Sequence, residues 1–406
     1  MEAYERLIRY IGFDTVSDEE STTTPSTAKQ FDLARELERE MREMGLQDVY
    51  LDDHAYVYGK LPATPGYENK TPIGFIAHLD TVTTGKNGPA AYQIIPDYDG
   101  GDVALGESGN TLSPEQFPHL KDLVGETLIT TDGTMVLGAD DKAGIAEILT
   151  MCEHLVGSGH SHGPISVCFT PDEEIGHGAS LLDLERFGAK FAYTADGSAV
   201  QEVECETFNA AAARWEITGV SVHPGSAKDV MINAARVATE IDHMLPGSER
   251  PRDTEGRQGF YHLTDMSGDV SHARINYIIR DHDAAVFEQR KQVMRDVEKA
   301  INAKYGAGTA RLTLVDQYRN MAEIIARYPE TMEAAFAAVR SVGLEPVSKP
   351  VRGGTDGAQL SFRGLPCPNL GTGSYCYHGP FEHTSVQQMD KAVQVLEAVA
   401  DWFAAR

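Results

Sequence analysis

Two pairs of adjacent carboxylates stand directly after apolar segments of this chain. Asp140 and Asp141 end the stretch VLGADD, and Glu173 and Glu174 follow ISVCFTP. An unpaired carboxylate is costly to bury, so acidic side chains at such positions need a cationic partner or a metal ion. Metal binding is therefore the first chemical hypothesis for these residues.

A histidine and two more acidic residues occupy equivalent places. His78 and Asp80 follow the apolar run IGFIA, and Asp196 ends KFAYTAD. In open α/β sheets, ligands bind outside the carboxyl ends of the strands. A single carboxylate there often caps the next helix, which is the simpler interpretation of Asp141. Four successive strands that all end in carboxylates favour a shared site instead.

The residue types indicate which ions such a site would hold. Carboxylates mixed with imidazole suit Zn²⁺, Co²⁺ or Mn²⁺ better than Mg²⁺ or Ca²⁺, which favour oxygen ligands alone. Five ligands that include one shared carboxylate point to a two-metal centre, with ions roughly 3.5–4 Å apart. Such a pair lowers the pKa of water and polarises the carbonyl under attack. One member of the Glu pair could bind metal while its neighbour acts as general base.

The elements that position these residues are typical of an α/β fold. We expect strands at IGFIAHL, MVLGAD, ISVCFTP and KFAYTAD, with helices between them, including one from Lys142 to about Leu155. Apolar strands without polar alternation predict a central sheet that is covered on both faces.

The pattern changes between residues 208 and 320. A strand at NAAAARWEITGV is followed by a helix near 228–244, strands at GFYHLTD and HARINYIIRD, a long helix from AAVFEQ and a strand at ARLTLVDQY. This order is ferredoxin-like. We therefore expect a small α/β domain at 208–320, inserted between two parts of a catalytic domain at 1–207 and 321–406. The last part should contain a helix at about 329–342, the loop VRGGTDGAQ and a closing helix from about 386.

Composition narrows the class of protein. A chain of 406 residues is too long for one average domain. The net charge of -26 argues against a nucleic-acid partner. No apolar run reaches the roughly 18 residues of a membrane span. Five cysteines without CxxC spacing favour free thiols in a reducing compartment. We therefore expect a soluble cytoplasmic protein.

Several motifs together resemble the M20 metallopeptidases: HLD, GADDKAG, PDEEIG, TADG, GGTDG and YHGPFE. Their order and spacing are similar to the aminotripeptidase branch of that family. The similarity extends over nearly the whole chain and includes GVSVHPG and NYIIRDHD of the inserted region. It implies a zinc-peptidase-like domain with an inserted lid and dimerisation domain. It also implies a homodimer and a two-metal aminopeptidase that releases the N-terminal residue from tripeptides, with Zn²⁺ expected and Co²⁺ or Mn²⁺ as alternatives.

The resemblance also implies roles for single residues. The metal ligands would be His78, Asp140, Glu174, Asp196 and His378. Asp140 would bridge the two ions, and its peptide bond to the next Asp is often cis in the family. Asp80 would orient the imidazole of His78. Glu173 would be the general base that transfers a proton from water to the leaving amine.

Five further residues match substrate-binding positions of the family, namely His223, Arg280, Gly353, Gly354 and Thr355. His223 would stabilise the oxyanion, Arg280 would grip a substrate carboxylate, and the other three would line the pocket. From the residues alone, His223 is a loop histidine and Arg280 pairs with Asp281 at the surface.

Three histidines and one proline complicate this assignment. His383 competes with His378 as a ligand. His160 and His162 have metal-like spacing, but their polar Gly/Ser loop predicts exposure to solvent. Pro380 stands where the family pattern has a basic residue.

Two other functions remain open at this point. Another M20-type amidohydrolase, such as a dipeptidase or N-deacylase, would use the same metal centre. The inserted motifs GFYHL and NYIIRDHD favour the aminopeptidase instead. A catalytically inactive scaffold could keep the ligands but would have no need for Glu173 and Asp80, both of which are present.

Overall fold

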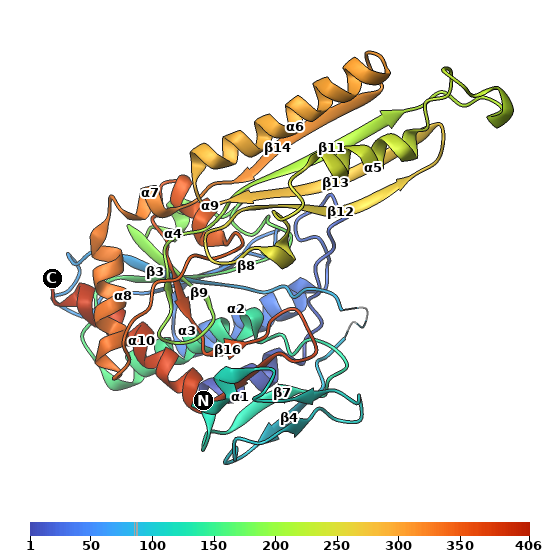
Figure 1. The fold of residues 1–406 in the computed structure, drawn as a ribbon. Coiled ribbons are helices and arrows are strands. Elements are labelled where there is room, and N and C mark those ends of the chain that lie inside the picture. Colours follow the sequence, from blue (N-terminus) through green and yellow to red (C-terminus); the bar gives the residue numbers. More distant parts are fainter. Residues whose placement is uncertain (85, 87) are drawn as a thin grey trace. The chain divides into compact units, whose positions relative to one another are not determined.

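The computed structural model describes residues 1–84, 86 and 88–406 and divides the chain into two compact units (Figure 1). The first contains Met1–Cys205, Met321–Lys349 and Thr355–Arg406, and the second contains Glu206–Asn320 and Pro350–Gly354. The second unit therefore starts at 206 rather than 208 and includes a later segment that the sequence placed in the catalytic part. Backbone hydrogen bonds from Val351 N to Glu206 O and from Phe208 N to Gly353 O explain this difference.

A sheet with both parallel and antiparallel pairs forms the centre of the first unit. Its strands, in spatial order, are β1 (Gln47–Leu51), β2 (Val57–Leu61), β8 (Ile165–Thr170), β3 (Ile73–His78), β9 (Phe191–Gly197), β15 (Asn369–Gly371) and β10 (Val203–Glu204). β3 lies between β8 and β9 and is parallel to both, and β15 is parallel to β9. β1, β2 and β10 pair antiparallel, so the sheet is mixed, as predicted.

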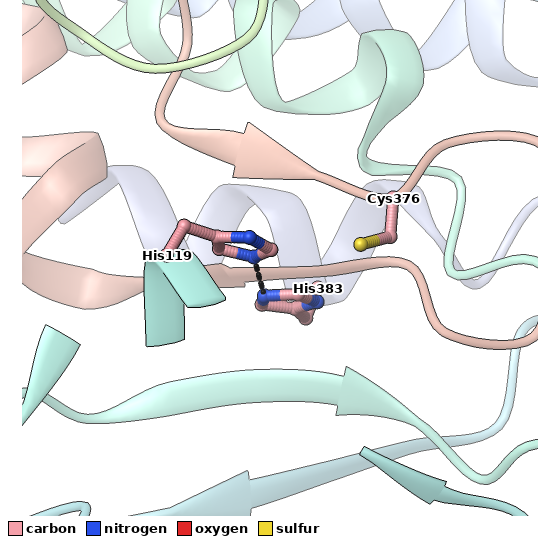
Figure 2. Close-up of side chains that lie close together, drawn as sticks. All are labelled: His119, Cys376 and His383. Atoms are coloured by element: carbon pink, nitrogen blue, oxygen red, sulfur yellow. Dashed lines mark hydrogen bonds between the residues drawn. The ribbon is translucent and has the colours of Figure 1, made fainter. Parts of the chain in front are cut away.

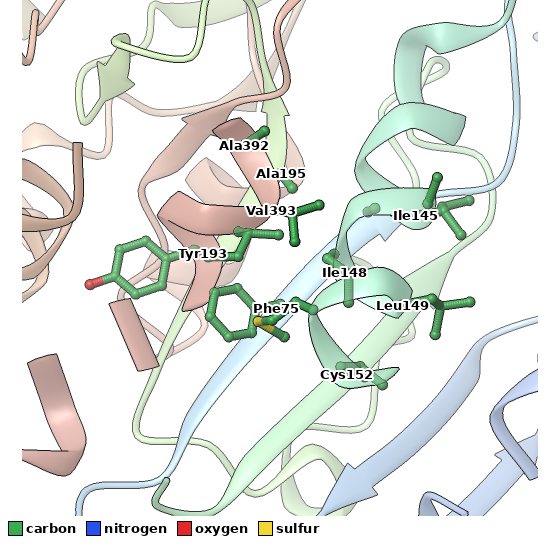
Figure 3. Close-up of a cluster of buried hydrophobic side chains, with 14 of the residues drawn as sticks. Phe75, Ile145, Ile148, Leu149, Cys152, Tyr193, Ala195, Ala392 and Val393 are labelled. Atoms are coloured by element: carbon green, nitrogen blue, oxygen red, sulfur yellow. The ribbon is translucent and has the colours of Figure 1, made fainter. Parts of the chain in front are cut away.

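Helices cover both faces of this sheet. They are α1 (Ala3–Tyr10), α2 (Gln30–Met44), α3 (Ala139–Ser158), α4 (Leu184–Phe187), α7 (Ala322–Ile325), α8 (Pro329–Ser341), α9 (Asp356–Phe362) and α10 (Val386–Ala404). Because successive strand side chains point to opposite faces, Phe75 and Ile76 of β3 join different cores. Phe75 packs with the α3 and α10 side chains drawn in Figure 3, whereas Ile76 shares a core with Phe187 and Leu360.

A smaller antiparallel sheet in the same unit carries the late part of the chain. Its strands, in spatial order, are β16 (Ser374–Tyr375), β17 (His383–Ser385), β7 (Leu128–Thr131) and β4 (Tyr92–Ile95). Nearby are the short pair β5 (Val103–Ala104) and β6 (Thr111–Leu112) and the 3-10 helix η1 (Pro118–Leu123). This sheet anchors both ends of the segment that bears His378.

The second unit has the ferredoxin-like order that the sequence predicted. Its elements are β11 (Asn209–Thr218), η2 (Pro224–Ser226), α5 (Ala234–Met244), η3 (Pro251–Asp253), β12 (Phe260–Gly268), β13 (His272–Asp281), α6 (Ala284–Tyr305) and β14 (Ala310–Tyr318). The antiparallel strands lie in the order β12-β13-β11-β14. Trp215 and Ile275 pack with Ile241 of α5 and Met294 of α6, while Arg214 stays exposed beside Trp215. One face of this sheet is therefore the core face.

The structure contradicts the expected strand at MVLGAD. Met135–Gly138 form no strand, and α3 begins at Ala139. The backbone N–H groups of Leu137 and Gly138 donate to the buried carboxylate of Glu382, at 2.7 and 3.0 Å, instead of to a neighbouring strand. A side chain about 245 positions later thus replaces sheet pairing.

Two element boundaries also differ from the prediction, each because of a side-chain cap. The segment TDGAQ begins helix α9 rather than staying a loop, since the Thr355 hydroxyl accepts from Ala358 N. Helix α5 starts at Ala234 and not near 228, because Asn233 caps it through Arg236 N. Thr355 and Asn233 are residue types that are commonly found at the N-cap of a helix.

No helix within the described residues is long and apolar enough to cross a membrane. The five cysteines are free thiols, and Cys152, Cys168 and Cys367 are buried. The structure thus agrees with the expectation of unpaired thiols.

Glu147, in the middle of α3, is fully buried, and neither carboxyl oxygen has a hydrogen-bond partner among the described residues. Burial raises its pKa well above the ordinary value. A raised carboxyl pKa means that the folded protein binds this proton more tightly. The contribution of this proton to the free energy of unfolding is fully present below the pKa that Glu147 has in the unfolded chain. It is lost as the pH rises through the higher pKa of the folded state.

We therefore expect Glu147→Gln to become more stabilising, relative to the wild type, as the pH rises from 5.5 to 8. Each unit of pKa difference traversed contributes about 1.4 kcal/mol. Thermal unfolding midpoints of both proteins at the two pH values measure the effect, with the exposed Glu107→Gln as control. A difference that does not grow with pH contradicts the prediction.

Candidate active site

Three neighbouring parallel strands bring the predicted residues to one edge of the sheet. His78 ends β3, Glu173 and Glu174 follow β8, and Asp196 stands near the end of β9. Since β8, β3 and β9 run in the same direction, their carboxyl ends meet there. Asp140 reaches the same place from the start of α3 rather than from a strand.

Asp140 lies between two imidazoles and turns one oxygen toward each. Its Oδ1 is 3.0 Å from His78 Nε2, and its Oδ2 is 3.1 Å from His378 Nε2. Glu174 Oε2 is 3.0 Å from His378 Nε2, and Asp196 Oδ1 is 3.6 Å from His78 Nε2. The five residues expected as metal ligands thus form one continuous series of contacts.

The carboxylates of this cluster need positive charge beside them to stay ionised. Burial raises the pKa of Glu174 to about 7 and that of Asp196 to about 6. Hydrogen bonds to Asp140 and Glu174 raise the pKa of His378 to about 11. Burial opposes ionisation of His78, yet the adjacent carboxylates Asp140 and Asp196 raise its pKa above the usual range. Carboxylates that burial destabilises as anions need cations beside them.

The donor set fits divalent metal ions. His78, Asp140 and Glu174 offer ligand atoms that all lie within 4.8 Å of one another, and so do His78, Asp141 and Asp196. Two imidazole nitrogens with several carboxylates form the mixed set that transition-metal ions prefer. The residues present therefore fit divalent metal ions.

Asp141 does not have the helix-capping role that the simpler interpretation gave it. The N-cap of α3 is Gly138 and makes no side-chain cap. Instead, the buried Asp141 carboxylate accepts from the backbone N–H of His78 at 3.0 Å. It thereby ties the start of α3 to the end of β3. The Asp140–Asp141 peptide bond is cis, as the resemblance implied.

Asp80 contacts both His78 and the Glu pair, but with different atoms. His78 Nδ1 is 2.9 Å from the Asp80 carbonyl oxygen and 3.4 Å from its carboxylate. A carbonyl only accepts, so Nδ1 carries a proton, and Nε2, which faces Asp140, is the nitrogen that could bind a metal ion. The carboxylate accepts from the backbone N–H groups of Glu173 and Glu174, at 2.9 and 3.3 Å. Asp80 therefore orients the imidazole mainly through its backbone and fixes the Glu pair through its side chain.

Glu173 has the properties of a proton acceptor. Burial, followed by the negative charge of Asp196, raises its pKa well above the ordinary value. A carboxylate whose pKa is raised toward the operating pH accepts and returns protons efficiently.

Sequence reasoning missed the importance of two acidic residues. Glu382 accepts from the backbone N–H of Asp140 at 2.9 Å, in addition to its two bonds to the preceding loop. The buried Asp356 accepts from the Thr170 hydroxyl at 2.8 Å, and burial raises its pKa to about 7. A Cβ on Gly178 would lie 2.4 Å from this carboxylate, so Gly178 leaves room for it. The only sequence signals were the His378–Glu382 spacing and the acid in GGTDG.

Replacing Glu382 by Gln should weaken metal binding without removing a ligand. One carboxylate oxygen becomes an amide N–H₂ that faces backbone N–H groups, so the loop that carries Asp140 loses its fixed position. We expect metal affinity to fall about 10- to 100-fold, as for other groups that orient a ligand. Metal titration by calorimetry measures this, with the exposed Glu345→Gln as control. Unchanged affinity contradicts the prediction.

Two predicted substrate-binding residues share a neighbour in the second unit. The Arg280 guanidinium lies over the Tyr318 ring at 5.1 Å and donates to Gln317 Oε1 at 2.9 Å. A Cβ on Gly354 would lie 2.6 Å from the Tyr318 ring. The expected surface pair between Arg280 and Asp281 is wrong, because Asp281 pairs with Arg290 at 2.7 Å. Among the described residues, no carboxylate forms an ion pair with Arg280.

The other three substrate-binding candidates have local structural contacts. His223 is exposed, and its Nδ1 accepts from Gly225 N in the turn η2. Gly353 O accepts from Phe208 N. Thr355 caps α9. Their roles toward a substrate stay predictions.

The remaining histidines lie outside the metal-binding cluster. His160 is exposed and contacts Asp401. The expectation that His162 is exposed is wrong, because it is buried and its Nδ1 donates to Gly163 O. Its loop packs back onto the chain at Thr64, which the local sequence did not reveal. His383, the competing ligand, contacts His119 instead of Asp140 or Glu174.

Comparison with known proteins agrees with this geometry. Residues 129–402 match the model of peptidase family M20/M25/M40. The chain belongs to the M20 peptidases. It is 49% identical over 401 residues to a peptidase T of Clostridium novyi, covering 98% of each chain, and 48% identical to a peptidase T of Bacillus licheniformis, covering 99% of this chain and 98% of that one.

Solved structures of this family have the same fold. An aminopeptidase PepT from Bacillus cereus superposes with a TM-score of 0.77 at 22% identity, covering 100% of this chain and 98% of that one. A dinuclear metal-binding M20 peptidase from Bacillus subtilis gives 0.64 at 15% identity, covering 98% and 96%.

Membership of the peptidase T group confirms the predicted class of enzyme. The chain is a hydrolase, a metal-dependent aminopeptidase that acts on peptides and requires divalent metal ions. The alternative, another M20-type dipeptidase or N-deacylase, is not favoured by relatives that match almost the full chain as peptidase T.

Proposed function

We propose that this peptidase removes the N-terminal residue from tripeptides and uses two metal ions, which are Zn²⁺ in the cell. The ligands of these ions are His78, Asp140, Glu174, Asp196 and His378. The observation that carries this proposal is Asp140, with one oxygen toward His78 and the other toward His378. When bound, the ions polarise the scissile carbonyl and activate water for attack.

The protein's own groups position the reactants and move the proton. Glu173 removes a proton from the attacking water and returns it to the nitrogen of the leaving dipeptide. Asp80 holds the backbone of Glu173 and Glu174 in place by two hydrogen bonds. His223 stabilises the oxyanion, and Gly353, Gly354 and Thr355 line the substrate pocket.

Arg280 binds the carboxylate at the C-terminal end of the tripeptide in this proposal. Its guanidinium contacts an amide oxygen, the Ile279 carbonyl oxygen and an aromatic ring, none of which is a carboxylate, so its charge is still available to a ligand. A bidentate guanidinium–carboxylate contact suits a substrate of defined length.

Three substrates test the assignment. Protein loaded with Zn²⁺ or Co²⁺ is incubated with a free tripeptide, its N-acetylated form and the matching dipeptide, and products are identified by mass spectrometry. Release of the N-terminal residue from the free tripeptide alone supports the proposal. Cleavage of the acetylated peptide or the dipeptide instead overturns the tripeptide specificity, and no turnover with two ions bound overturns the activity.

Arg280→Lys should raise KM for the tripeptide about 10- to 100-fold, because a charged hydrogen bond contributes about 1.5–3 kcal/mol. A tripeptide amide, which lacks the carboxylate, should respond much less to the change. The exposed Arg274→Lys on the same strand is the control. Equal effects on acid and amide contradict the role of Arg280.

We also propose that the second unit serves as lid and dimerisation domain of a cytoplasmic homodimer. Its edge strands β12 and β14 carry mostly exposed residues, which leaves them available for pairing. Free cysteines fit a reducing compartment. Sedimentation analysis of the purified protein tests the dimer, and a monomer at all concentrations overturns it.

A further inference from the structure

A second group of metal-ligating side chains lies outside the five proposed ligands. His119 comes from η1, Cys376 directly follows β16, and His383 begins β17 (Figure 2). One ligand atom from each lies within 4.8 Å of the others. His383 is fully buried, and the other two are half-buried. Residues from three separate segments thus converge on one point.

The hydrogen bonds of His383 define where its lone pair points. Its Nδ1 is 2.7 Å from the carbonyl oxygen of Phe381, which only accepts, so Nδ1 carries the proton. The lone pair of Nε2 therefore faces His119 Nε2 at 3.0 Å. A ring whose Nδ1–H is held by a backbone carbonyl is the usual orientation of a metal-binding histidine.

Both imidazoles are neutral near pH 7. Burial lowers the pKa of His119, and burial lowers the pKa of His383 to about 4. The Tyr375 ring stacks on His119 at 4.4 Å and lies 5.5 Å from His383. Neutral imidazole rings packed beside a tyrosine ring keep their lone pairs available to a metal ion.

The distance between the two imidazole nitrogens matches tetrahedral coordination of a metal ion. Two nitrogens, each about 2.0–2.1 Å from Zn²⁺, stand roughly 3.3 Å apart, close to the observed 3.0 Å. A thiolate about 2.3 Å from the same ion lies roughly 3.6 Å from each nitrogen, so Cys376 needs only a small movement. Cys376 has a φ of 59°, a left-handed conformation that is uncommon for residues other than Gly.

We propose that His119, Cys376 and His383 form a third metal site, which binds one Zn²⁺ or a similarly thiol-seeking divalent ion. The ion displaces the thiol proton, and the single proton of His119 moves from Nε2 to Nδ1, so that both imidazoles bind through Nε2 as neutral ligands. Cys376 and His383 stand at the two ends of the segment 377–382. An ion between them would close the loop that carries His378 and Glu382, and would tie it to η1.

Cobalt distinguishes this site from the two-ion centre, whose proposed ligands include no thiolate. Metal-free protein is reconstituted with Co²⁺, and the bound metal is counted by elemental mass spectrometry while the near-ultraviolet spectrum is recorded. We expect three ions per chain and a thiolate-to-cobalt charge-transfer band. Added Zn²⁺ should abolish the band, because Zn²⁺ binds such sites more tightly than Co²⁺.

Cys376→Ser and His119→Gln should each reduce the count from three ions to two, and Cys376→Ser should also abolish the band. Cys205→Ser removes another half-buried thiol and should leave three ions and the band unchanged. Two bound ions also show that each variant is folded. A wild type with two ions or without the band, or a third ion that persists in Cys376→Ser, overturns the proposal and leaves a simple histidine–histidine hydrogen bond.

Discussion

Replacing Glu173 by Gln is expected to lower kcat for tripeptide cleavage about 10²- to 10⁴-fold, the usual contribution of a general base. The amide keeps the size of the side chain but cannot accept the proton from water. Glu173 is not one of the five proposed ligands, so both ions should remain bound. Steady-state kinetics together with metal analysis measure the two effects on one sample.

Kinetic and metal measurements on the same sample separate loss of the general base from loss of the metal site. Glu19→Gln, at an exposed position, controls for the change of charge. A variant that loses its ions along with its activity shows that Glu173 is a ligand rather than a base. A variant with unchanged kcat contradicts the role altogether.

Asp140→Asn should remove both ions and with them all measurable activity. One oxygen of Asp140 faces each imidazole, at 3.0 and 3.1 Å, so the amide weakens two ligand shells at once. The loss of affinity should exceed the approximately 10²-fold upper value for a group that only orients a ligand. Metal content after dialysis and the rate with excess Zn²⁺ are the two measurements.

Asp196→Asn provides the matched comparison for this variant. Asp196 Oδ1 is 3.6 Å from His78 Nε2, and among the described residues Asp196 forms no ion pair with the other imidazole, so its replacement should release one ion and retain the other. Equal metal loss in the two variants contradicts a bridging role for Asp140.

Much of the fold could be predicted because its signals are local. The buried strands at 73–78, 165–170 and 191–197 are continuous apolar runs, and each ends in the residues that form the site. Their parallel arrangement follows from the helices between them. His78, Glu174 and Asp196 were therefore expected to meet.

The parts that the sequence did not predict depend on contacts between distant segments. The loop before Asp140 is apolar enough for a strand, yet its backbone N–H groups bind Glu382, far along the chain. The burial of His162 depends on packing against Thr64. Asp356 sits in a Gly-rich motif whose local pattern indicates a loop, whereas its carboxylate is buried beside Thr170. The spacing of apolar residues along the chain contains no information about such contacts between distant residues.

The late position of His378 and Glu382 in the chain affects when the enzyme becomes active. Most of the cluster is encoded before residue 200, but one imidazole and the carboxylate that accepts from Asp140 N are encoded much later, at His378 and Glu382. A nascent chain on the ribosome therefore carries an incomplete site, even after its first strands and helices have formed. We expect a chain that ends before residue 378 to lack hydrolytic activity.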